Sequence, residues 1–269
     1  MNTRDKGLES AVAIPDVQSS IDTRHIAIQS VGIRSVKYPV LIELSGQKPM
    51  PSVAEFEMTV FLPADQKGTH MSRFVALLEE SQGTTLTVAG FRAMLKDMLN
   101  RLDAPSGRIK MELPYFLSKI APVSGVSSLM DYQLTLDGSA SAAGEDIYLT
   151  VVVPVTSLCP CSKKISEYGA HNQRSHVTAR VLLKEDLDIA LLISSIEQQA
   201  SCELYGLLKR PDEKYVTERA YDNPKFVEDL VRDVAIALNK FKEIGHYTVE
   251  AENFESIHNH SAYARIDRA

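Results

Sequence analysis

The sequence contains no tryptophan, and aromatic residues make up only 7% of its 269 positions. A surface that stacks nucleobases on exposed aromatic rings is therefore not expected. The chain also has only three cysteines, and two of them, Cys159 and Cys161, are separated by a single residue. So few thiols cannot build a disulfide framework. In a reducing compartment they serve in packing, as metal ligands or as nucleophiles.

Long hydrophobic runs are also missing. The longest, over residues 147–155, is far too short to cross a bilayer, and the first residues lack the continuous apolar segment of a signal peptide. We therefore expect a cytoplasmic protein. The net charge of −6 disfavours nucleic acid or an anionic membrane as a partner, because both require a broad basic surface. A small phosphorylated ligand, held by a local group of Lys and Arg, is still compatible with this charge.

The rest of the composition is that of a globular domain, with 44% hydrophobic and 24% charged residues. Residues 1–24 are polar and aperiodic, which predicts an extended arm before a single domain over residues 25–269. Alternating apolar residues predict strands over 26–44, 56–62, 109–113, 132–136, 147–155, 177–183 and 247–251. Apolar residues at helical spacing predict helices over 71–80, 87–102, 187–204 and 224–241. Small polar residues predict a hairpin loop over 137–146.

The order of these elements is strands, two helices, strands, two helices and a strand. It predicts an antiparallel α+β protein with two similar ββαα modules, approximately residues 25–120 and 121–269, and with the helices on one side of the sheet. The last of these helices has the strongest signal, because Asn223 can cap it and Pro224 suits its first position. Gly245 is expected to end this helix, and the strand that follows is expected to be the last.

The first chemical motif is Cys159-Pro160-Cys161, which directly follows the predicted strand over 147–155. Zinc is bound in proteins by Cys sulfur and His nitrogen. Structural zinc sites space their cysteines by two to four residues, so the one-residue spacing is a weak zinc signal. On this motif alone, two small buried thiols after a core strand are the favoured interpretation.

Histidines gather in the same part of the chain. His171 and His176 belong to a polar stretch over 169–176, which we interpret as a loop between two core strands, where functional residues are commonly carried. His171 ranks above His176, because His176 opens the next strand. His258 and His260 share one face if the chain there is extended, which permits a pair of ligands, although terminal histidines are commonly exposed to solvent.

Two carboxylates complete the candidate set. Glu213 lies in the charged segment 210–214, which we interpret as a loop whose charges are explained by solvation alone. Glu228 lies in the predicted helix over 224–241, where its spacing favours an exposed i,i+4 ion pair with Arg232. The pattern alone therefore favours structural roles for both residues.

Basic residues cluster around the same segments, namely Lys163, Lys164, Arg174 and Arg180. In a chain of net charge −6, this concentration suits an anionic ligand such as a triphosphate. Arg180 is equally well explained as an outward residue of a strand. The pattern as a whole predicts a metal-binding site of thiols and imidazoles beside positive charge, and it leaves the reaction open.

The motifs also carry a family resemblance. The run PVTSLCPCSK over 154–163, followed by GAHNQR over 169–174, strongly resembles the signature of the prokaryotic type IB GTP cyclohydrolases. Residues 15–18, 22–24 and 31–33 are similar to the N-terminal motif of that family, and the resemblance extends over nearly the whole chain. It implies the tunnelling fold, in which ββαα modules assemble side by side into a barrel with helices outside. It also implies a homotetramer with active sites at subunit interfaces.

The resemblance further implies an activity, the hydrolysis of GTP to formate and 7,8-dihydroneopterin triphosphate, which is the first step of folate biosynthesis. By this resemblance a divalent metal is held by Cys159, His171, Glu213 and His258. Zinc is the expected ion, with manganese or iron(II) as alternatives. Glu228 matches the residue that anchors the guanine edge. Cys161 either assists at the metal or transfers a proton, and the roles of the two cysteines are interchangeable at this stage.

The substrate roles follow from the same resemblance. Protonation of guanine N7 requires a general acid, for which His171 is the candidate if the metal does not fully engage it. The residues expected to bind the substrate are Lys163, Lys164, Gln173 and Arg174, joined by Arg24 from a neighbouring subunit.

Alternatives stay open. One is a related tunnelling-fold enzyme of the deazaguanine nitrile reductase type, with Cys161 as nucleophile and NADPH as reductant. The sequence contains no convincing Gly-rich strand–helix fingerprint for that cofactor. Another is a purine- or pterin-binding metal protein without turnover. An enzyme similar to the archaeal relatives would release a cyclic-phosphate pterin instead.

Overall fold

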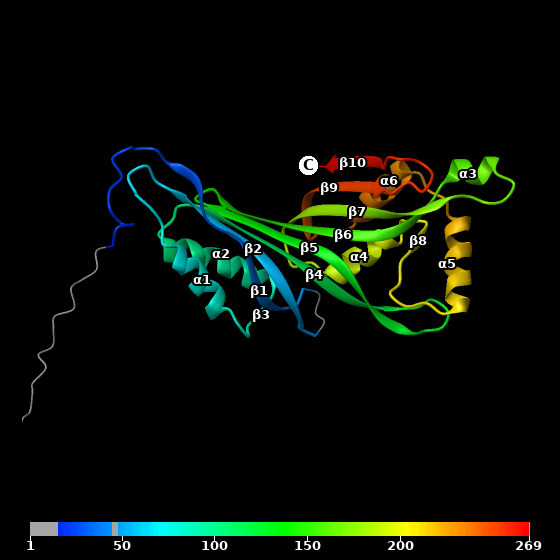
Figure 1. The fold of residues 1–269 in the computed structure, drawn as a ribbon, viewed down its shortest axis with the longest axis horizontal. Coiled ribbons are helices and arrows are strands. Elements are labelled where there is room, and N and C mark those ends of the chain that lie inside the picture. Colours follow the sequence, from blue (N-terminus) through cyan, green and yellow to red (C-terminus); the bar gives the residue numbers. More distant parts are fainter. Residues whose placement is uncertain (1–15, 45–47, 269) are drawn as a thin grey trace, which may run out of the picture.

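The computed structural model describes residues 16–44 and 48–268. The strands are β1 (Ile28–Ile42), β2 (Met50–Leu62), β3 (Thr85–Leu86), β4 (Gly107–Ile120), β5 (Ser127–Ser141), β6 (Gly144–Leu158), β7 (Asn172–Leu183), β8 (Cys202–Glu203), β9 (Ile244–Asn253) and β10 (Ala262–Arg268). The helices are α1 (Met71–Glu80), α2 (Val88–Leu102), α3 (Pro160–Ile165), α4 (Ile189–Glu197), α5 (Arg210–Asp222) and α6 (Val227–Leu238). One sheet joins the strands in the order β10-β9-β7-β6-β5-β4-β2-β1-β3, and β8 pairs with β6 outside this path (Figure 1).

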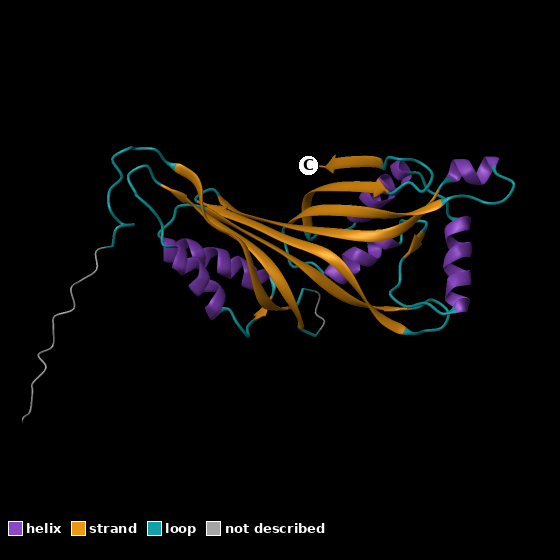
Figure 2. Cartoon of the chain, in the orientation of Figure 1, coloured by secondary structure: helices purple, strands orange, loops and turns teal. Residues whose placement is uncertain are grey.

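The sheet is antiparallel except for the short parallel pairing of β1 with β3. Along its central strands every second side chain is buried, as expected for a sheet with one covered face. In β6 these side chains are 0% exposed and belong to Ile147, Leu149, Val151, Val153 and Val155. Buried side chains of α1, α2, α4 and α6 belong to the same core cluster, so these four helices cover that face of the sheet (Figure 2).

The other two helices, α3 and α5, lie at one end of the sheet (Figure 1). Helix α5 packs there against β6 and β8. A small second cluster of buried residues forms this contact, made of Leu158, Cys202 and Ala220. The end of β6 is thus enclosed separately from the main core.

Much of the predicted secondary structure is confirmed. The helix predicted over 71–80 is α1, and the one predicted over 87–102 is α2. The side chain of Thr87 caps α2 by accepting a hydrogen bond from the backbone N–H of Gly90 at 3.0 Å. The α+β class with a large antiparallel sheet is also confirmed.

The hairpin predicted over 137–146 is confirmed, but its loop is much shorter than predicted. Strand β5 continues to Ser141 and β6 begins at Gly144, so two residues join them. The glycine at position 138 is explained by the close approach of α2, because a Cβ on Gly138 would lie 2.8 Å from the ring of Phe91. The contact between helix and sheet, rather than a turn, requires glycine there.

The loop predicted over 169–176 is wrong for most of its length, because β7 begins at Asn172. Gln173 and Ser175 occupy buried positions in the same alternation as the apolar residues after them. These polar residues extend the strand because they have partners: the hydroxyl of Ser175 donates to Oγ of Ser157 at 2.8 Å.

The loop interpretation of residues 210–214, and with it the loop placement of Glu213, is also wrong. These residues form the first turn of α5. The carboxylate of Asp212 accepts a hydrogen bond from the backbone N–H of Lys209 at 2.8 Å. A side-chain acceptor of this kind satisfies one of the free N–H groups at the start of a helix, so the charged segment is helical.

Other predicted boundaries are corrected as well. The helix predicted over 224–241 begins at Val227, and Asn223 ends α5 instead of capping α6, with its side-chain amide donating to the carbonyl of Ala200 at 2.8 Å. The helix predicted over 187–204 is the shorter α4, followed by β8. Gly245 lies inside β9, and β10 follows the strand that was expected to be the last.

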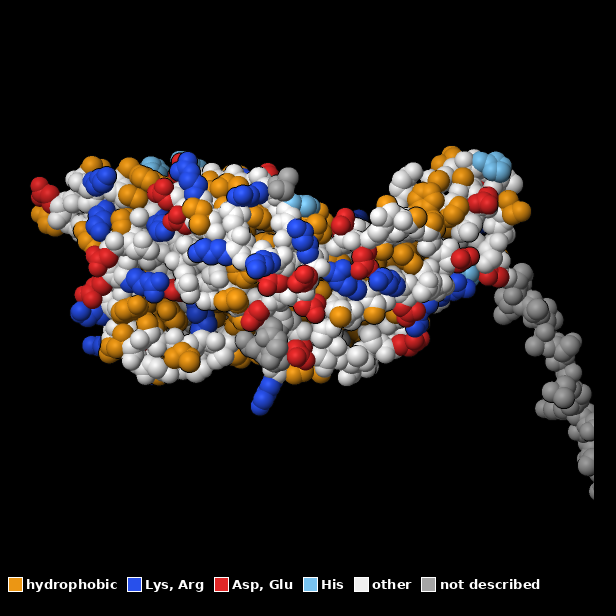
Figure 3. Space-filling model, turned by 180° about the vertical axis from the view of Figure 1, so that it is seen from behind, with side chains coloured by type: hydrophobic (Ala, Val, Ile, Leu, Met, Phe, Trp, Pro, Cys, Tyr) orange, Lys and Arg blue, Asp and Glu red, His pale blue; other side chains and the backbone are white. Residues whose placement is uncertain are grey.

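The predicted arm falls only partly within the described residues, since positions 1–15 lie outside them. From residue 16 the chain lies against the loop between β2 and α1, where the backbone N–H of Asp22 donates to the carbonyl of Asp65 at 2.9 Å. Basic and acidic side chains are mixed over the face seen in Figure 3. Across residues 16–44 and 48–268, no helix is both long enough and apolar enough to cross a membrane.

Candidate functional site

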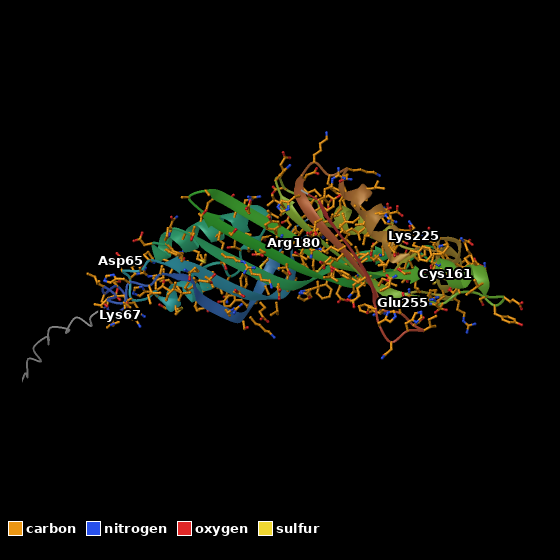
Figure 4. All side chains as sticks on the ribbon, turned by 90° about the horizontal axis from the view of Figure 1, so that it is seen from above. Asp65, Lys67, Cys161, Arg180, Lys225 and Glu255 are labelled. Atoms are coloured by element: carbon orange, nitrogen blue, oxygen red, sulfur yellow. The ribbon has the colours of Figure 1, made fainter. Side chains whose placement is uncertain are left out.

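The candidate residues gather where three neighbouring strands reach the same end of the sheet. Leu158 at the end of β6 pairs with Asn172 at the start of β7, and Ser175 of β7 pairs with Asn253 at the end of β9. In Figure 4, Cys161 and Glu255 lie at this end of the molecule, whereas Asp65 and Lys67 lie at the opposite end. The antiparallel register thus brings the cysteine motif, His171 and the segment after β9 together.

Cys159 and His171 are joined through their backbones. The N–H of Cys159 donates to the carbonyl of His171 at 3.1 Å. Ser162 adds a second link, because its hydroxyl donates to the carbonyl of Cys159 at 3.2 Å and accepts from the N–H of His171 at 3.2 Å. Sγ of Cys159 also accepts from the N–H of Ser162 at 3.5 Å. The backbones of Cys159 and His171 are therefore held in a fixed relation.

The cysteines differ in exposure. Cys159 is half-buried beside His171, whereas Cys161 is exposed on α3. The third cysteine, Cys202, is buried behind the end of β6, and burial raises the pKa of its thiol to about 11. Cys202 is thus a packing residue, and Cys159 is the thiol best placed to act together with His171.

The ring of His171 has three polar neighbours. Its Nδ1 lies 3.0 Å from Oε1 of Gln173, 3.4 Å from Oγ of Ser256 and 4.0 Å from Oε2 of Glu255. This arrangement favours the tautomer in which Nδ1–H donates to Gln173, which leaves the lone pair on Nε2. An imidazole oriented in this way through its other nitrogen is typical of a metal ligand.

The second histidine pair lies in the loop between β9 and β10. His258 and His260 are exposed, and their rings are stacked with centroids 5.2 Å apart. The loop is attached to β7 at its start, where the N–H of Phe254 donates to the carbonyl of Arg174 at 3.0 Å. The loop that carries this pair therefore begins at the same end of the sheet as Cys159.

Glu213 approaches the same end from α5. Two residues that follow it at i+4 and i+8, Thr217 and Tyr221, line an open cleft together with Leu158 and residues 167–170 and 172. Side chains at this spacing lie on one side of a helix. Glu213, which is exposed in the first turn of α5, precedes these two residues on the same side of the helix.

Asp212, the neighbour of Glu213, is a buried carboxylate that the sequence analysis missed. It is 0% exposed and accepts hydrogen bonds from Ser124, Lys209 and Val123. Burial alone would raise the pKa of Asp212, but these hydrogen bonds outweigh burial and hold the pKa well below its usual value. An acidic residue at the third position of a helix whose second residue is proline was a signal for such a cap.

Glu228 lies in the first turn of α6 and is exposed. The connection before it is fixed to the end of β6, because the N–H of Lys225 donates to the carbonyl of Leu158 at 3.1 Å. The predicted ion pair of Glu228 with Arg232 is not formed: Arg232 lies 3.9 Å from Asp229 instead. Glu228 thus has no ion-pair partner within the described ranges.

The predicted basic residues are only partly brought together. Lys163 donates to the carbonyl of Tyr221, and its ammonium lies 4.2 Å from the centre of the Tyr221 ring, so it connects α3 to α5. Lys164 and Arg174 are exposed near the same end. Arg180 lies in the middle of the sheet, with its guanidinium 3.4 Å from the centre of the Tyr148 ring (Figure 4). Arg180 therefore does not belong to this site.

The four proposed metal ligands are not assembled within one protomer. Over the described part of the chain, no three His, Cys, Asp or Glu side chains are grouped so that they could hold a metal ion. Cys159 and His171 do share one end of the sheet, and the chemistry of the full set suits zinc, which binds thiolate, imidazole and carboxylate. The donor types of this set therefore fit a metal such as zinc, while the described residues of one chain do not group three of them.

A family model and two curated proteins each match this chain over nearly its whole length. A family model described as type I GTP cyclohydrolase folE2 matches residues 14–264. The GTP cyclohydrolase FolE2 of Janthinobacterium sp. is 62% identical over 268 residues, covering 99% of this chain and 98% of that protein. GTP cyclohydrolase FolE2 2 of Cupriavidus metallidurans is 61% identical over 260 residues, covering 97% of each.

Among solved structures, a uricase from Arthrobacter globiformis is similar with a TM-score of 0.49 and 10% identity, covering 89% of this chain and 93% of that one. A likeness of this size does not bear on function.

Proposed function

The chain belongs to the type I GTP cyclohydrolase FolE2 family, and we propose that it releases formate from GTP with the help of a metal bound at the end of β6. Its activity is that of a GTP cyclohydrolase in folate synthesis. The proposed product is 7,8-dihydroneopterin triphosphate. The finer subtype, type IB, is proposed from the Cys-Pro-Cys and His-Asn-Gln-Arg motifs.

One observation supports this placement most strongly, the hydrogen-bonded link between Cys159 and His171. The proposed ligands are Cys159, His171, Glu213 and His258. A divalent metal of this kind supplies a hydroxide nucleophile at neutral pH, because it lowers the pKa of bound water to about 7. Zinc is the proposed ion, and manganese or iron(II) are the alternatives.

The other residues have roles of their own. A carboxylate at Glu228 accepts two N–H bonds from N1 and the 2-amino group of guanine, which selects guanine over adenine. A proton delivered to guanine N7 makes C8 more electrophilic, and Cys161 is the proposed donor, because a His171 that binds the metal through Nε2 and donates Nδ1–H to Gln173 has no proton to deliver. The triphosphate is assigned to Lys164 and Arg174, with Lys163 moving away from Tyr221 when substrate binds. Gln173 orients the ring of His171 beside the substrate.

The proposed assembly is a homotetramer of the tunnelling fold, with two ββαα modules per chain. It is supported by the placement of the ligands, because Glu213 and His258 lie on separate elements that do not group with Cys159 in one protomer. A site completed between subunits would account for this. The proposed location is the cytoplasm.

A direct experiment incubates metal-stripped protein with GTP and with each of zinc, manganese and iron(II). Formate release, and a fluorescent pterin after oxidation, are the expected results. Binding of GTP without formate under every metal would favour the non-catalytic alternative. Oxidation of NADPH with a deazaguanine nitrile would favour the reductase alternative, and the product mass separates a cyclic-phosphate pterin from the triphosphate.

A further inference from the structure

The start of α5 is fixed to the rest of the protein by one buried carboxylate. Oδ1 of Asp212 accepts hydrogen bonds from the backbone N–H groups of Val123 and Ser124, both at 2.8 Å. Oδ2 accepts from the hydroxyl of Ser124 at 2.6 Å and from the N–H of Lys209 at 2.8 Å. We call this arrangement the Asp212 clamp. It joins the first turn of α5 to the turn between β4 and β5.

That turn is itself firmly held. At the end of β4, Nζ of Lys119 donates to Oε1 of Glu197 at 2.7 Å, and the hydroxyl of Tyr132 donates to the same oxygen at 2.7 Å. Glu197 is 5% exposed, so this ion pair is buried and geometrically demanding. The segment before α5 also lies close to β5, since a Cβ on Gly206 would lie 2.5 Å from the carbonyl of Leu129.

The clamp fixes both the position and the rotation of α5. Successive residues of a helix are 100° apart, so an inward Asp212 places Glu213 on the neighbouring side of the helix. Thr217 and Tyr221 continue that side of the helix. Their side chains line the cleft beside the segment before His171. A helix start free to turn or slide would carry Glu213 with it.

We propose that Asp212 is a positioning residue that presents Glu213 as a metal ligand by clamping the start of α5 to the turn between β4 and β5. This inference rests on the proposed function, in which Glu213 binds the metal. Asp212 itself is turned away from the cleft and does not touch the metal. Supporting residues that orient a ligand in this way typically change metal affinity about 10- to 100-fold when they are replaced.

The test measures zinc affinity of the full chain by competition with a chromogenic chelator. In Asp212→Asn the amide nitrogen cannot accept from the N–H of Lys209, so zinc binding is expected to weaken about 10-fold or more. In a Glu213→Gln background the same substitution is expected to change affinity less than about 2-fold, because both residues act through one ligand. Equal weakening in the two backgrounds, or wild-type affinity of a folded Asp212→Asn variant, overturns the inference.

A milder pair of variants covers the case in which Asp212→Asn does not fold. Ser124→Ala removes one of the four hydrogen bonds to Asp212 and is expected to weaken zinc binding. Ser124→Thr keeps the hydroxyl and is expected to bind zinc with wild-type affinity. The matched control is Tyr247→Phe, which removes hydrogen bonds to Ala235 and Asn239 at the far end of α6. It is expected to lower Tm but to leave zinc affinity unchanged.

The design separates this inference from the proposed function. Unchanged zinc affinity in Cys159→Ala as well as in Glu213→Gln contradicts the proposed metal site itself. Loss of zinc in Cys159→Ala with unchanged affinity in Glu213→Gln removes Glu213 from the proposed ligands and the clamp with it. Loss of zinc in both of these variants with unchanged affinity in a folded Asp212→Asn contradicts only the role of the clamp.

Discussion

The middle and the end of the central strands fill their buried positions differently. In the middle of β6, Leu149 and Val151 are 0% exposed and belong to the apolar core beneath the helices. At the end of the strands, the buried positions are held by Ser157 of β6, Ser175 of β7 and Asn253 of β9.

These polar residues form a connected row across three strands. The hydroxyl of Ser175 donates to that of Ser157 at 2.8 Å, and the Ser157 hydroxyl lies 3.5 Å from Oδ1 of Asn253. The row lies on the strand ends next to Cys159 and His171, since Ser157 precedes Cys159 by two residues and Ser175 follows His171 by four. Apolar burial thus stabilises the middle of the sheet, while hydrogen bonds fix the geometry of its end. Changes in the middle should lower stability alone, and changes at the end should lower activity first.

The largest effect on activity is expected for Cys159→Ala. The substitution removes a proposed ligand from a half-buried position outside the core, so metal and formate release should be lost by at least about 100-fold. Thermal unfolding of the metal-free variant should stay close to that of metal-free wild type. A well-folded, metal-free variant with full turnover would contradict the assignment of activity to the end of the central strands.

The matching substitution in the middle of the sheet is Leu149→Ala. Removing this fully buried side chain should lower the free energy of unfolding by about 2–5 kcal/mol, through lost burial and a cavity. Chemical denaturation measures this change, and kcat per folded molecule should stay near the wild-type value. A loss of kcat without a loss of stability would contradict the assignment of the middle to stability alone.

A smaller effect is expected for Glu228→Gln. The amide removes the charge that strengthens hydrogen bonds to guanine, so kcat/KM for GTP should fall about 10- to 100-fold while stability stays unchanged. Steady-state formate release measures this, with Glu218→Gln on the exposed face of α5 as a control for the loss of one surface charge. Equal kcat/KM in both variants would remove Glu228 from the site.

The smallest effect, and the one that sharpens the comparison most, is expected for Ser175→Ala. It removes one buried donor from the polar row and should lower the free energy of unfolding by about 1 kcal/mol. Because the row supports the site, kcat should fall as well, by less than about 10-fold. Lowered stability with unchanged kcat would show that the row serves packing only.

The same contrast explains what the sequence could predict. The middle of the sheet repeats one simple rule, apolar residues at every second position, so strands such as β6 and helices such as α1 and α2 are readable from the sequence. The start of β7 breaks that rule, because Gln173 and Ser175 are buried but polar. The partner of Ser175 is Ser157 on β6, and no local pattern reveals such pairing between strands.

The candidate site was predictable in its residue types and not in its arrangement. Cys159 and His171 were identified from their motifs, and the ladder between β6 and β7 brings them together. Glu213 was misplaced in a loop, because charge dominates the composition of α5 and the local capping signal of Pro211 and Asp212 was missed. The contacts of Asp212 with Val123 and Ser124 are tertiary, and no local pattern reveals them.

X-ray absorption of the zinc-loaded protein tests the central claim most directly. The account predicts one sulfur ligand at about 2.3 Å with nitrogen and oxygen ligands at about 2.0–2.2 Å. The sulfur contribution should vanish in Cys159→Ser and persist in Cys161→Ser. A zinc spectrum without sulfur, or one that loses its sulfur only in Cys161→Ser, would contradict the pairing of Cys159 with His171 as the core of the metal site.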